Sequence, residues 1–372
     1  MPLENDTKKI KLLILTPTLE CGGSEKYVAL LSNNINSEKF AVTVAILNNA
    51  RPFYTIKNST VNIIDLKVKH VRNSLIKIMR LTAAENPDII FTTANHLNIY
   101  IAVFRRFFSK RIVIIARESN VVSINNTKTK FPSLYNWLCK KYYQKLDFII
   151  CQSQYMQADL LNNYNIKREK TLILNNPVET GVLSSQSSLQ NVHPKRGKFI
   201  TVARLSDQKG IDRLLRSIAK LSKPFNYYII GEGEKKEAIK SLIVKLHLQN
   251  KVFLEGRKEN PFSGHEDAEL FLMGSYYEGF PNTLLEAGVL GIPVIAFNAP
   301  GGINEIIIDG ENGLLIKDND EAAFAFAIEK AQAANFNRGQ IKAFTEKRFA
   351  VNHIVKQTED LFVQLYNMAK HK

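Results

Sequence analysis

Short apolar runs alternate with longer stretches of helical periodicity along most of the chain. This alternation is typical of parallel α/β folds, in which a helix follows each strand and covers the sheet. A first series of predicted strands covers residues 11–16, 41–47, 61–65, 88–92, 111–116, 148–151 and 171–174, and a second covers 198–202, 227–230, 252–255, 270–273, 293–296 and 313–316. Helical spacing is clearest at 24–34 and 211–221. The pattern predicts two α/β domains, each with its own core.

A polar, serine-rich segment separates the two series and lacks apolar periodicity. We assign residues 181–197 as the linker, which leaves an N-terminal domain at 1–180 and a C-terminal domain at 198–351. The final segment, 352–372, places Ile354, Leu361 and Leu365 near one helical face. It is predicted to form a terminal helix that docks on a domain surface.

Composition narrows the setting in which the chain works. Of its 372 residues 45% are hydrophobic and 23% charged, and charges interrupt every apolar run well short of the roughly 20 residues that a membrane span needs. The basic start precedes only a strand-length apolar run, which is too short for a signal-peptide core. The three cysteines, Cys21, Cys139 and Cys151, form no CxxC pair, so neither a disulfide framework nor a zinc site is expected. We expect a reduced, cytoplasmic setting.

Positive charge is concentrated in the first half of the chain. Residues 1–180 hold 25 Lys and Arg against 13 Asp and Glu, a net +12, whereas the remainder holds 25 against 22, a net +3. Ten basic residues and a single acid, Glu118, lie between Arg105 and Lys145. Aromatic residues are interleaved with them: Phe107, Phe108, Phe131, Tyr135, Trp137, Tyr142 and Tyr143. Such a stretch suits nucleic acid, an anionic membrane surface or a phosphorylated substrate, and equally suits a solvated surface above core aromatics.

The most specific motif lies at 274–296 and contains two glutamates eight residues apart. Glu278 precedes a Gly-Phe-Pro-Asn turn at 279–282, and Glu286 lies in a helix predicted from about Thr283. Pro281 suits the entry to that helix, whose free N–H groups suit phosphate or sugar hydroxyls. Glu286 is placed to accept hydrogen bonds from a diol such as a ribose. Two acids alone are equally consistent with a turn carboxylate and a solvated helix residue.

A second motif at 200–218 predicts a strand, a turn and a helix. Arg204 and Lys209 follow the strand, at the carboxyl edge where open parallel sheets bind their ligands. An Arg fork and a Lys point charge there suit a diphosphate. Gly210 then lets the backbone turn into the helix.

A third motif at 14–35 joins a strand to a helix through Gly22 and Gly23, with Ser24 as a candidate helix cap. Paired glycines let a backbone approach a ligand closely and expose its N–H groups. The motif matches neither the dinucleotide fingerprint nor a Walker loop, and it also suits simple helix packing.

Together the three motifs resemble those of retaining glycosyltransferases with two Rossmann-like domains (the GT-B fold), specifically the GT4 family of nucleotide-sugar-dependent enzymes. GGSEK at 22–26 resembles the glycine loop of that family, and VARLSDQKG at 202–210 its diphosphate-binding segment. EGFPNTLLEAG at 278–288 is similar to its E-x7-E signature, in the form typical of bacterial polysaccharide enzymes. The resemblance covers about residues 10–365. It implies an α/β fold of two doubly wound domains facing a central cleft, with a terminal helix crossing back to the first.

The resemblance also implies roles for individual residues. Arg204 and Lys209 would hold the donor diphosphate, and Glu286 would bond the nucleotide ribose. Glu278 would contact the donor sugar. The segment that follows Glu278 would line the same subsite through Gly279, Phe280, Pro281, Asn282 and Thr283.

Two glycine pairs would complete the donor site. Gly22 and Gly23 would approach the phosphates, and Gly231 and Gly233, in YYIIGEGE, would lie near the nucleotide base.

One position departs from the family pattern. Many members place a histidine after the strand that here reads IVIIARESN, where this chain has Arg117. His96, after the preceding strand, is assigned a helix-start or core role. Arg117 is expected either to stabilise the departing phosphate or to grip an acidic acceptor, and it joins Glu278, Arg204 and Lys209 as a catalytic candidate.

Neither a metal nor another cofactor is expected. Asp318-Asn-Asp320 resembles the metal-binding DxD of the other main glycosyltransferase fold, but it follows the predicted strand at 313–316, where a helix cap is the better assignment.

The resemblance implies transfer, with retention, from a nucleoside diphosphate sugar to a glycan or polyprenyl-diphosphate-linked saccharide. A UDP-hexose or UDP-N-acetylhexosamine is the expected donor by analogy, and GDP-mannose remains open. The basic, aromatic stretch predicts peripheral docking on the inner face of the cytoplasmic membrane and no nucleic-acid partner. The alternatives are a GT-B epimerase, a phosphorylase, and a non-catalytic binder of nucleic acid or anionic surfaces, which would need no intact donor site.

Overall fold

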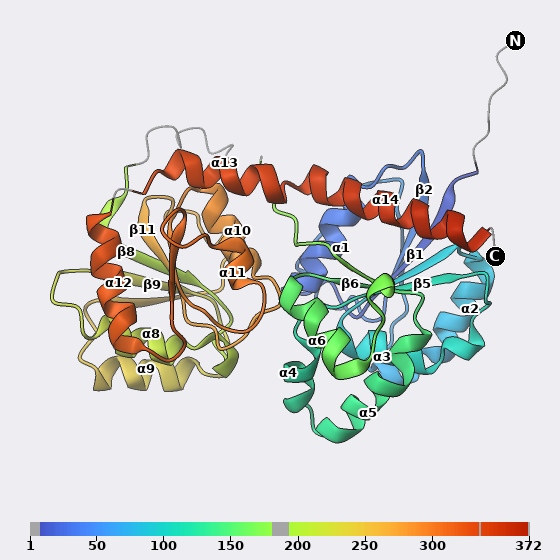
Figure 1. Cartoon of the computed structure of the whole chain (residues 1–372), viewed down its shortest axis with the longest axis horizontal. Coiled ribbons are helices and arrows are strands. Elements are labelled where there is room, and N and C mark those ends of the chain that lie inside the picture. The colour runs from blue at the N-terminus through green and yellow to red at the C-terminus, as the bar shows by residue number, and fades with distance from the viewer. Residues whose placement is uncertain (1–7, 181–192, 335, 371–372) are drawn as a thin grey trace, which may run out of the picture. The chain divides into compact units, whose positions relative to one another are not determined.

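The computed structural model describes residues 8–180, 193–334 and 336–370 (Figure 1). The chain forms two compact units: unit 1 comprises Met1–Pro177 and Val351–Lys372, and unit 2 comprises Val178–Ala350. Most of the predicted linker, 181–192, lies outside the described residues. Its last three residues belong to strand β8 (Lys195–Val202), which begins earlier than predicted. The apolar pattern did not reveal this start, because Lys195 and Arg196 are polar and exposed.

Unit 1 contains a seven-stranded parallel sheet in the order β3-β2-β1-β4-β5-β6-β7. All seven strands of the first predicted series are present, with ends shifted by at most two residues. They are β1 (Ile10–Thr16), β2 (Phe40–Ile46), β3 (Asn62–Asp65), β4 (Ile89–Thr93), β5 (Val113–Arg117), β6 (Phe148–Cys151) and β7 (Thr171–Ile173). The helices are α1 (Gly23–Asn34), α2 (Leu75–Glu85), α3 (Asn95–Val103), α4 (Val122–Thr127), α5 (Pro132–Tyr142), α6 (Gln154–Tyr164) and α14 (Val351–Lys370).

Unit 2 contains a six-stranded parallel sheet in the order β10-β9-β8-β11-β12-β13. After β8, its strands are β9 (Asn226–Ile230), β10 (Val252–Gly256), β11 (Ala268–Met273), β12 (Val294–Phe297) and β13 (Gly313–Ile316). Its helices are α8 (Ile211–Ile218), α9 (Lys236–Lys245), α10 (Asn282–Val289), α11 (Ile303–Ile306), α12 (Glu321–Ala333) and α13 (Arg338–Phe349). Both sheets are doubly wound, which confirms the predicted fold class.

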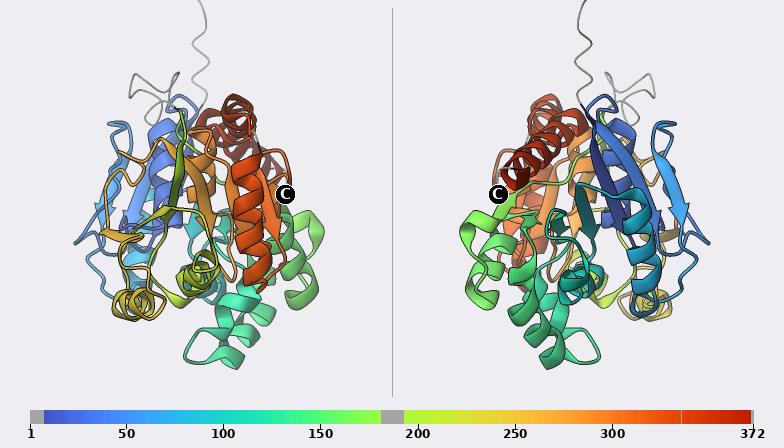
Figure 2. Two further views of the ribbon diagram at one scale, coloured as in Figure 1. Left: turned by 90° about the vertical axis from the view of Figure 1, so that its left-hand side faces the viewer. Right: turned by 90° about the vertical axis from the view of Figure 1, so that its right-hand side faces the viewer.

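Each sheet is buried on both faces, which explains the continuous apolar runs of its strands. Successive residues of a strand point to opposite faces. In β1, Leu13 and Leu15 pack in the core beneath α3, α5 and α6, whereas Leu12 and Ile14 pack in the core beneath α1 and α14. Unit 2 has the same two-sided arrangement, with one core under α8, α9 and α12 and another under α10, α11 and α13. The side views show helices on both faces of the strands (Figure 2).

The last helix, α14, docks on unit 1. Phe362 makes edge-to-face contacts with Phe40 and Phe91 in the core, at ring-centroid distances of 6.2 and 5.4 Å. Thr358 Oγ1 shares a hydrogen bond of 3.0 Å with the Tyr27 hydroxyl of α1. The helix thereby covers one face of the sheet although it lies more than 170 residues beyond β7 in the chain.

Within the described ranges, none of the helices combines the length and the apolar composition needed for a membrane span.

Candidate active site

The strand order of unit 2 reverses between β8 and its neighbour β11, because the chain leaves β8 toward β9 on one side and returns to β11 on the other. Ligands of doubly wound sheets bind outside the carboxyl ends of the strands at such a switch point. Arg204 and Lys209 follow β8, and Glu278 follows β11. The fold therefore brings the second and first sequence motifs to one place.

Lys209 and Glu278 form a direct ion pair at this edge. Lys209 Nζ lies 2.5 Å from Glu278 Oε1, and the Ser275 hydroxyl donates to the same oxygen at 2.6 Å. The Glu278 side chain is almost fully buried, and its backbone N–H donates to the Pro300 carbonyl at 2.9 Å. Two donors thus hold one carboxylate oxygen, and a backbone hydrogen bond fixes the residue that carries it.

The turn between Lys209 and α8 packs directly on the loop that carries Glu278. A Cβ atom on Gly210 would lie 1.9 Å from the Gly274 carbonyl oxygen, and one on Gly274 would lie 2.4 Å from the Gly210 carbonyl oxygen. Gly210 also has a positive φ of 56°, a conformation that favours glycine. Two glycines in contact therefore set the distance between the halves of the site.

Arg213, which the sequence analysis did not single out, binds the backbone of the Glu278 loop. Its Nε donates to the Gly274 carbonyl at 2.5 Å and its Nη2 to the Ser275 carbonyl. Its Nη1 donates to Asp318 Oδ1 at 2.5 Å. The side chain is 1% exposed, so its bonds to the two carbonyls form away from water, where an unmet partner is costly, whereas the Asp318 carboxylate is partly exposed.

Two aromatic rings stack on the same guanidinium. The Arg213 Cζ lies 4.1 Å from the ring centroid of Tyr276 and 4.0 Å from that of Phe297. Arg213 lies in the first turn of α8, four residues after Lys209, so it joins the helix that follows the cation to the loop of the carboxylate. Helical periodicity places Arg213 on the polar side of the predicted helix, with Arg216 and Lys220, so nothing in the sequence indicated its burial.

Arg204, in contrast, is exposed. Its charge counteracts the rise in the pKa of the Tyr277 hydroxyl, which burial causes and Glu278 increases. The guanidinium is therefore electrostatically coupled to the loop of Glu278 while its fork remains accessible to a ligand.

Gly231 and Gly233 support the Arg204 loop by close backbone contact. A Cβ atom on Gly231 would lie 1.9 Å from the Ala203 carbonyl oxygen, and one on Gly233 would lie 2.2 Å from the Leu205 carbonyl oxygen. The Leu205 N–H donates to the Glu232 carbonyl at 3.0 Å. These glycines thus have a local packing role, whatever they contribute to binding.

The helix of Glu286 begins one residue earlier than predicted. Asn282 is the first residue of α10, Thr283 the second, and Pro281 is the N-cap with extended backbone, so the proline lies just outside the helix. Glu286 follows one turn later and is largely buried.

The rest of the turn is held by packing and backbone bonds. Phe280 is buried against Phe349, with 5.6 Å between ring centroids. The Gly279 carbonyl accepts from the Gly302 N–H at 2.9 Å.

The third motif lies in unit 1, at the carboxyl end of β1. Gly22 is the N-cap of α1 with extended backbone, and Gly23 is its first residue. Ser24 is therefore inside the helix and buried, and its expected capping role is wrong, because Gly22 takes the N-cap position and the helix already begins at Gly23. The Glu25 side chain folds back toward Gly22, where a Cβ atom would lie 2.2 Å from its Oε2.

Arg117 ends β5 and is fully buried within unit 1. Its Cζ lies 3.7 Å from the ring centroid of Tyr27, and its Nη2 donates to Asn176 Oδ1. Burial lowers the pKa of the guanidinium to about 10, so it stays charged at neutral pH. Its Nε and Nη1 have no hydrogen-bond partner in the described part of the chain. His96 lies exposed in the first turn of α3.

The Asp318–Asp320 segment has the predicted structural use. Asp320 is the N-cap of α12 and accepts from the Ala323 N–H at 2.8 Å, while Asp318 pairs with Arg213. In the parts of the chain that the structure describes, no cluster of three His, Cys, Asp or Glu side chains is placed to hold a metal ion.

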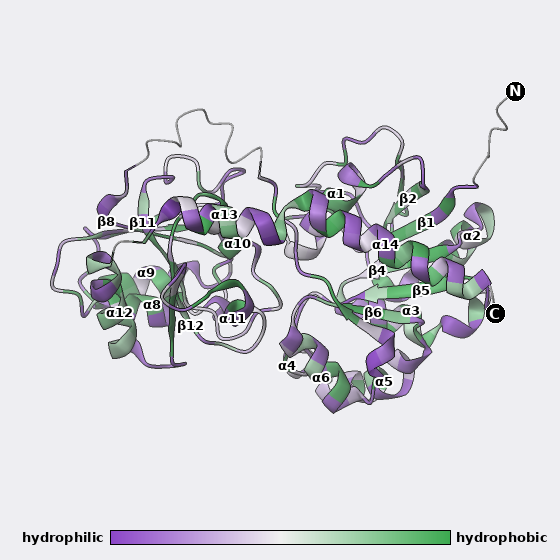
Figure 3. Cartoon of the chain, turned by 45° about the horizontal axis from the view of Figure 1, so that its top comes forward, coloured by the Kyte–Doolittle hydropathy of each residue, from purple (hydrophilic) through white to green (hydrophobic). Residues whose placement is uncertain are grey.

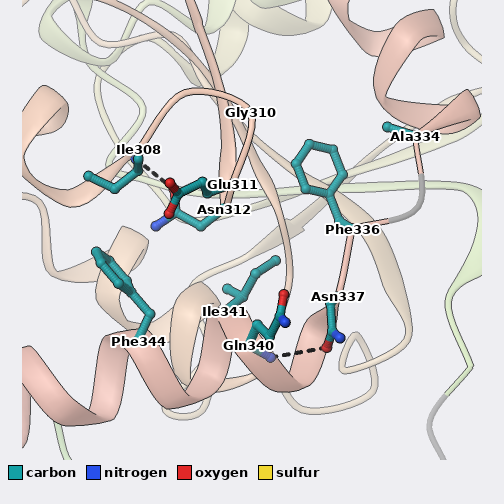
Figure 4. Close-up of a pocket in the computed structure, with 10 residues that line it drawn as sticks. All are labelled: Ile308, Gly310, Glu311, Asn312, Ala334, Phe336, Asn337, Gln340, Ile341 and Phe344. Carbon is teal, nitrogen blue, oxygen red and sulfur yellow. Dashed lines mark hydrogen bonds between the residues drawn. The ribbon is translucent and has the colours of Figure 1, made fainter.

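A pocket of about 440 Å³ lies elsewhere in unit 2, between the loop that precedes β13 and the first turns of α13 (Figure 4). None of the predicted site residues lines it. Its polar side chains serve the local backbone: Asn312 Oδ1 accepts from the Ile308 N–H at 2.7 Å, and Asn337 Oδ1 accepts from the Gln340 N–H at 3.1 Å. The candidate site at the strand ends is therefore separate from this pocket.

Two family profiles match the chain, "Glycosyltransferase Family 4" over residues 21–182 and "Glycosyl transferases group 1" over residues 186–348. The N-acetylgalactosamine-N,N'-diacetylbacillosaminyl-diphospho-undecaprenol 4-alpha-N-acetylgalactosaminyltransferase of Campylobacter jejuni is 30% identical over 326 residues, which cover 84% of this chain and 88% of that protein. A second transferase of that organism, which acts on GalNAc-alpha-(1->4)-GalNAc-alpha-(1->3)-diNAcBac-PP-undecaprenol, is 22% identical over 96% of this chain and 99% of its own length.

Solved structures show the same fold. The sucrose-phosphate synthase of Thermosynechococcus elongatus superimposes with a TM-score of 0.82 at 18% identity, covering 97% of this chain and 100% of that one. HepE of Anabaena in complex with UDP-glucose gives 0.76 at 19% identity, covering 95% and 100%. The matched profiles span both units and the Campylobacter relative most of the chain, and we conclude that this protein is a GT-B glycosyltransferase belonging to glycosyltransferase family 4.

Proposed function

We propose that the protein transfers a sugar, with retention of anomeric configuration, from a nucleoside diphosphate sugar to a glycan or a polyprenyl-diphosphate-linked saccharide. The observation that carries this proposal is the Lys209–Glu278 pair beside the exposed Arg204, at the switch point of the unit 2 sheet. The Campylobacter relatives, whose names give undecaprenyl-diphosphate-linked acceptors, support the acceptor class. The UDP and UDP-glucose complexes of HepE support a uridine nucleotide, with a UDP-hexose or UDP-N-acetylhexosamine as the donor.

The charges of the site suit a departing diphosphate. An ammonium group has three donor hydrogens, so the one that Glu278 accepts leaves two on Lys209 for phosphate oxygens. Arg204 adds a bidentate fork from the same loop. Stabilising the negative charge that develops on the leaving group is the largest contribution this site makes to the rate.

Glu278 is proposed to orient the donor sugar, and the leaving phosphate to accept the proton of the attacking hydroxyl on the face that it vacates. No protein nucleophile is then required, and the anomeric configuration is retained. Arg117 is proposed to favour an anionic group of the substrates through its charge, which it keeps while fully buried in unit 1, and not through a direct hydrogen bond.

A donor panel tests the proposal. Purified protein is incubated with UDP- and GDP-sugars and a polyprenyl-diphosphate-linked saccharide, and the anomeric configuration of the product is read by NMR. Transfer with inversion would refute the mechanism. Epimerised nucleotide sugar without transfer would favour an epimerase, and the absence of any turnover of nucleotide sugars would favour a non-catalytic binder.

The two glutamates are expected to separate by role. Glu286→Ala should weaken binding of the free nucleoside diphosphate by roughly 1–3 kcal/mol, the range for losing a hydrogen bond to a charged group. Glu278→Ala should mainly lower transfer, because the carboxylate proposed to orient the donor sugar is lost. Nucleotide affinity should change less, because Lys209, released from its ion pair, stays available to the diphosphate. Calorimetry with the nucleotide and steady-state kinetics measure the two effects, and the reverse order would exchange the assignments.

Transfer is also expected to proceed without a divalent metal, because Arg204 and Lys209 supply the positive charge at the diphosphate. Excess EDTA should leave kcat unchanged. A loss of activity that Mg²⁺ or Mn²⁺ restores would show that a metal takes part.

The proposed setting is the inner, cytoplasmic face of the membrane, with unit 1 docking peripherally. The net charge of +12 over residues 1–180 supports this proposal.

A further inference from the structure

Helix α5 presents apolar side chains to solvent on the side opposite its core contacts. Cys139 is fully buried in the core of unit 1. Phe131, Leu134 and Trp137 are 56%, 49% and 49% exposed. Residues three or four apart lie on one side of a helix, so Leu134, Trp137 and Lys141 form one outward stripe, and the exposed Phe131 lies just before it at the N-cap of α5. Figure 3 shows hydrophobic and hydrophilic residues mixed along α5.

Lysines surround the stripe and lie over its aromatic rings. Lys141 Nζ is 4.6 Å from the ring centroid of Trp137, and Lys130 Nζ is 5.6 Å from that of Phe131. Lys145 Nζ is 4.5 Å from the ring centroid of Tyr142. No Asp or Glu occurs in the sequence from residue 119 to residue 146. All the charged side chains of this stretch are therefore basic.

We propose that this α5 surface inserts into the headgroup region of an anionic bilayer and is the membrane contact of unit 1. Its members are Phe131, Leu134 and Trp137 with Lys130, Lys140, Lys141 and Lys145. Aromatic rings settle at the level of lipid headgroups, and lysines pair with lipid phosphates while their stems lie along apolar surface. A surface built for a nucleic-acid backbone would gain nothing from an exposed Leu134. The inference rests on the proposed lipid-linked acceptor.

The α5 surface is rigidly joined to the sheet. Asn126 Nδ2 donates to Asn136 Oδ1 at 3.0 Å, and the Tyr164 hydroxyl donates to the same atom at 2.7 Å. Just beyond the helix, the buried Tyr143 hydroxyl donates to Glu118 Oε1 at 2.7 Å. Glu118 directly follows β5, so a bilayer contact at α5 positions the strand end at which Arg117 lies.

The sequence supplies a direct probe, because Trp137 is the only tryptophan of the chain. Vesicles of phosphatidylcholine with phosphatidylglycerol should shift its emission to the blue, and lipids brominated on the acyl chain should quench it. Vesicles of phosphatidylcholine alone should do neither. No shift with anionic vesicles, or a shift with single-stranded RNA in their place, would overturn the proposal.

Variants separate the two components of binding. Lys140→Gln, Lys141→Gln and Lys145→Gln together should lower vesicle affinity about 100-fold, since each lysine near an anionic surface is worth on the order of fivefold. Leu134→Gln should reduce both affinity and bromolipid quenching. The matched control is Ile76→Gln on α2, which removes another exposed aliphatic side chain of unit 1 and should change neither. Equal losses in the two variants, or binding without quenching, would overturn insertion at α5.

The fluorescence experiment needs no acceptor, so its outcome is independent of the transferase assay. If α5 does not insert but transfer to a detergent-dispersed lipid-linked saccharide proceeds, the inference fails alone. If no donor is turned over, the proposed function fails, whatever the vesicles show.

Discussion

Replacing Lys209 by alanine is expected to lower kcat for sugar transfer by on the order of 10²–10³, the scale for deleting one preorganised group that stabilises developing charge. Lys209 is proposed to serve both the donor diphosphate and Glu278, so its loss removes the cation and leaves a buried carboxylate without its ion pair. Arg204→Ala is expected to have an effect of the same order. Steady-state kinetics at saturating donor measure both.

The matched control is Lys240→Ala. Lys240 is an exposed lysine of α9 that pairs with Glu237 at 2.8 Å, and its loss should leave kcat unchanged. Near-normal turnover in a folded Lys209→Ala protein would remove the diphosphate assignment.

Arg213→Met is expected to destabilise unit 2 by on the order of 2–6 kcal/mol, because two buried carbonyl oxygens lose their donors at a cost of about 1–3 kcal/mol each. The substitution leaves the Gly274 and Ser275 carbonyls and Asp318 without their donor, and methionine cannot replace any of the bonds. Arg213→Lys should recover part of the loss, since a lysine supplies charge but not the planar fork. Denaturant unfolding of the variants measures the change.

Arg216→Met provides the comparison, because Arg216 lies on the same helix but forms its ion pairs with Asp212 and Glu321 at a partly exposed site. Its loss should cost less than about 1 kcal/mol.

Arg213→Lys should also lower kcat more than it raises KM for the donor, because a displaced Glu278 loop affects the transition state more than nucleotide binding. Unfolding of Arg213→Met at the wild-type denaturant midpoint would show that the hydrogen bonds of Arg213 contribute nothing to the stability of unit 2.

The sequence by itself determined the fold class and all thirteen described strands. Strands of a parallel sheet are covered on both faces, so each appears as an uninterrupted apolar run, such as Ile10–Thr16. It also determined where the site motifs lie, because the residues that follow β8 and β11 are set by local chain order. Element ends were less certain, as at β8 and α1, where a polar or glycine residue extends an element beyond its apolar pattern.

Only the tertiary structure decided which distant residues meet. Lys209 and Glu278 are 69 residues apart, and their contact depends on β8 and β11 being neighbours, a matter of strand order that local periodicity does not encode. The burial of Arg213 depends likewise on carbonyls and rings from other elements.

The same holds for the aromatic residues between Arg105 and Lys145. Phe108 and Tyr143 lie in the core, whereas Phe107, Phe131 and Trp137 are exposed. Charge and composition were known from the sequence, but they are similar for a membrane-binding surface and for a solvated helix over core aromatics. What separates the two is the rotation of α5 about its axis, which is set by the packing of Cys139 into unit 1 and directs Trp137 to the opposite side.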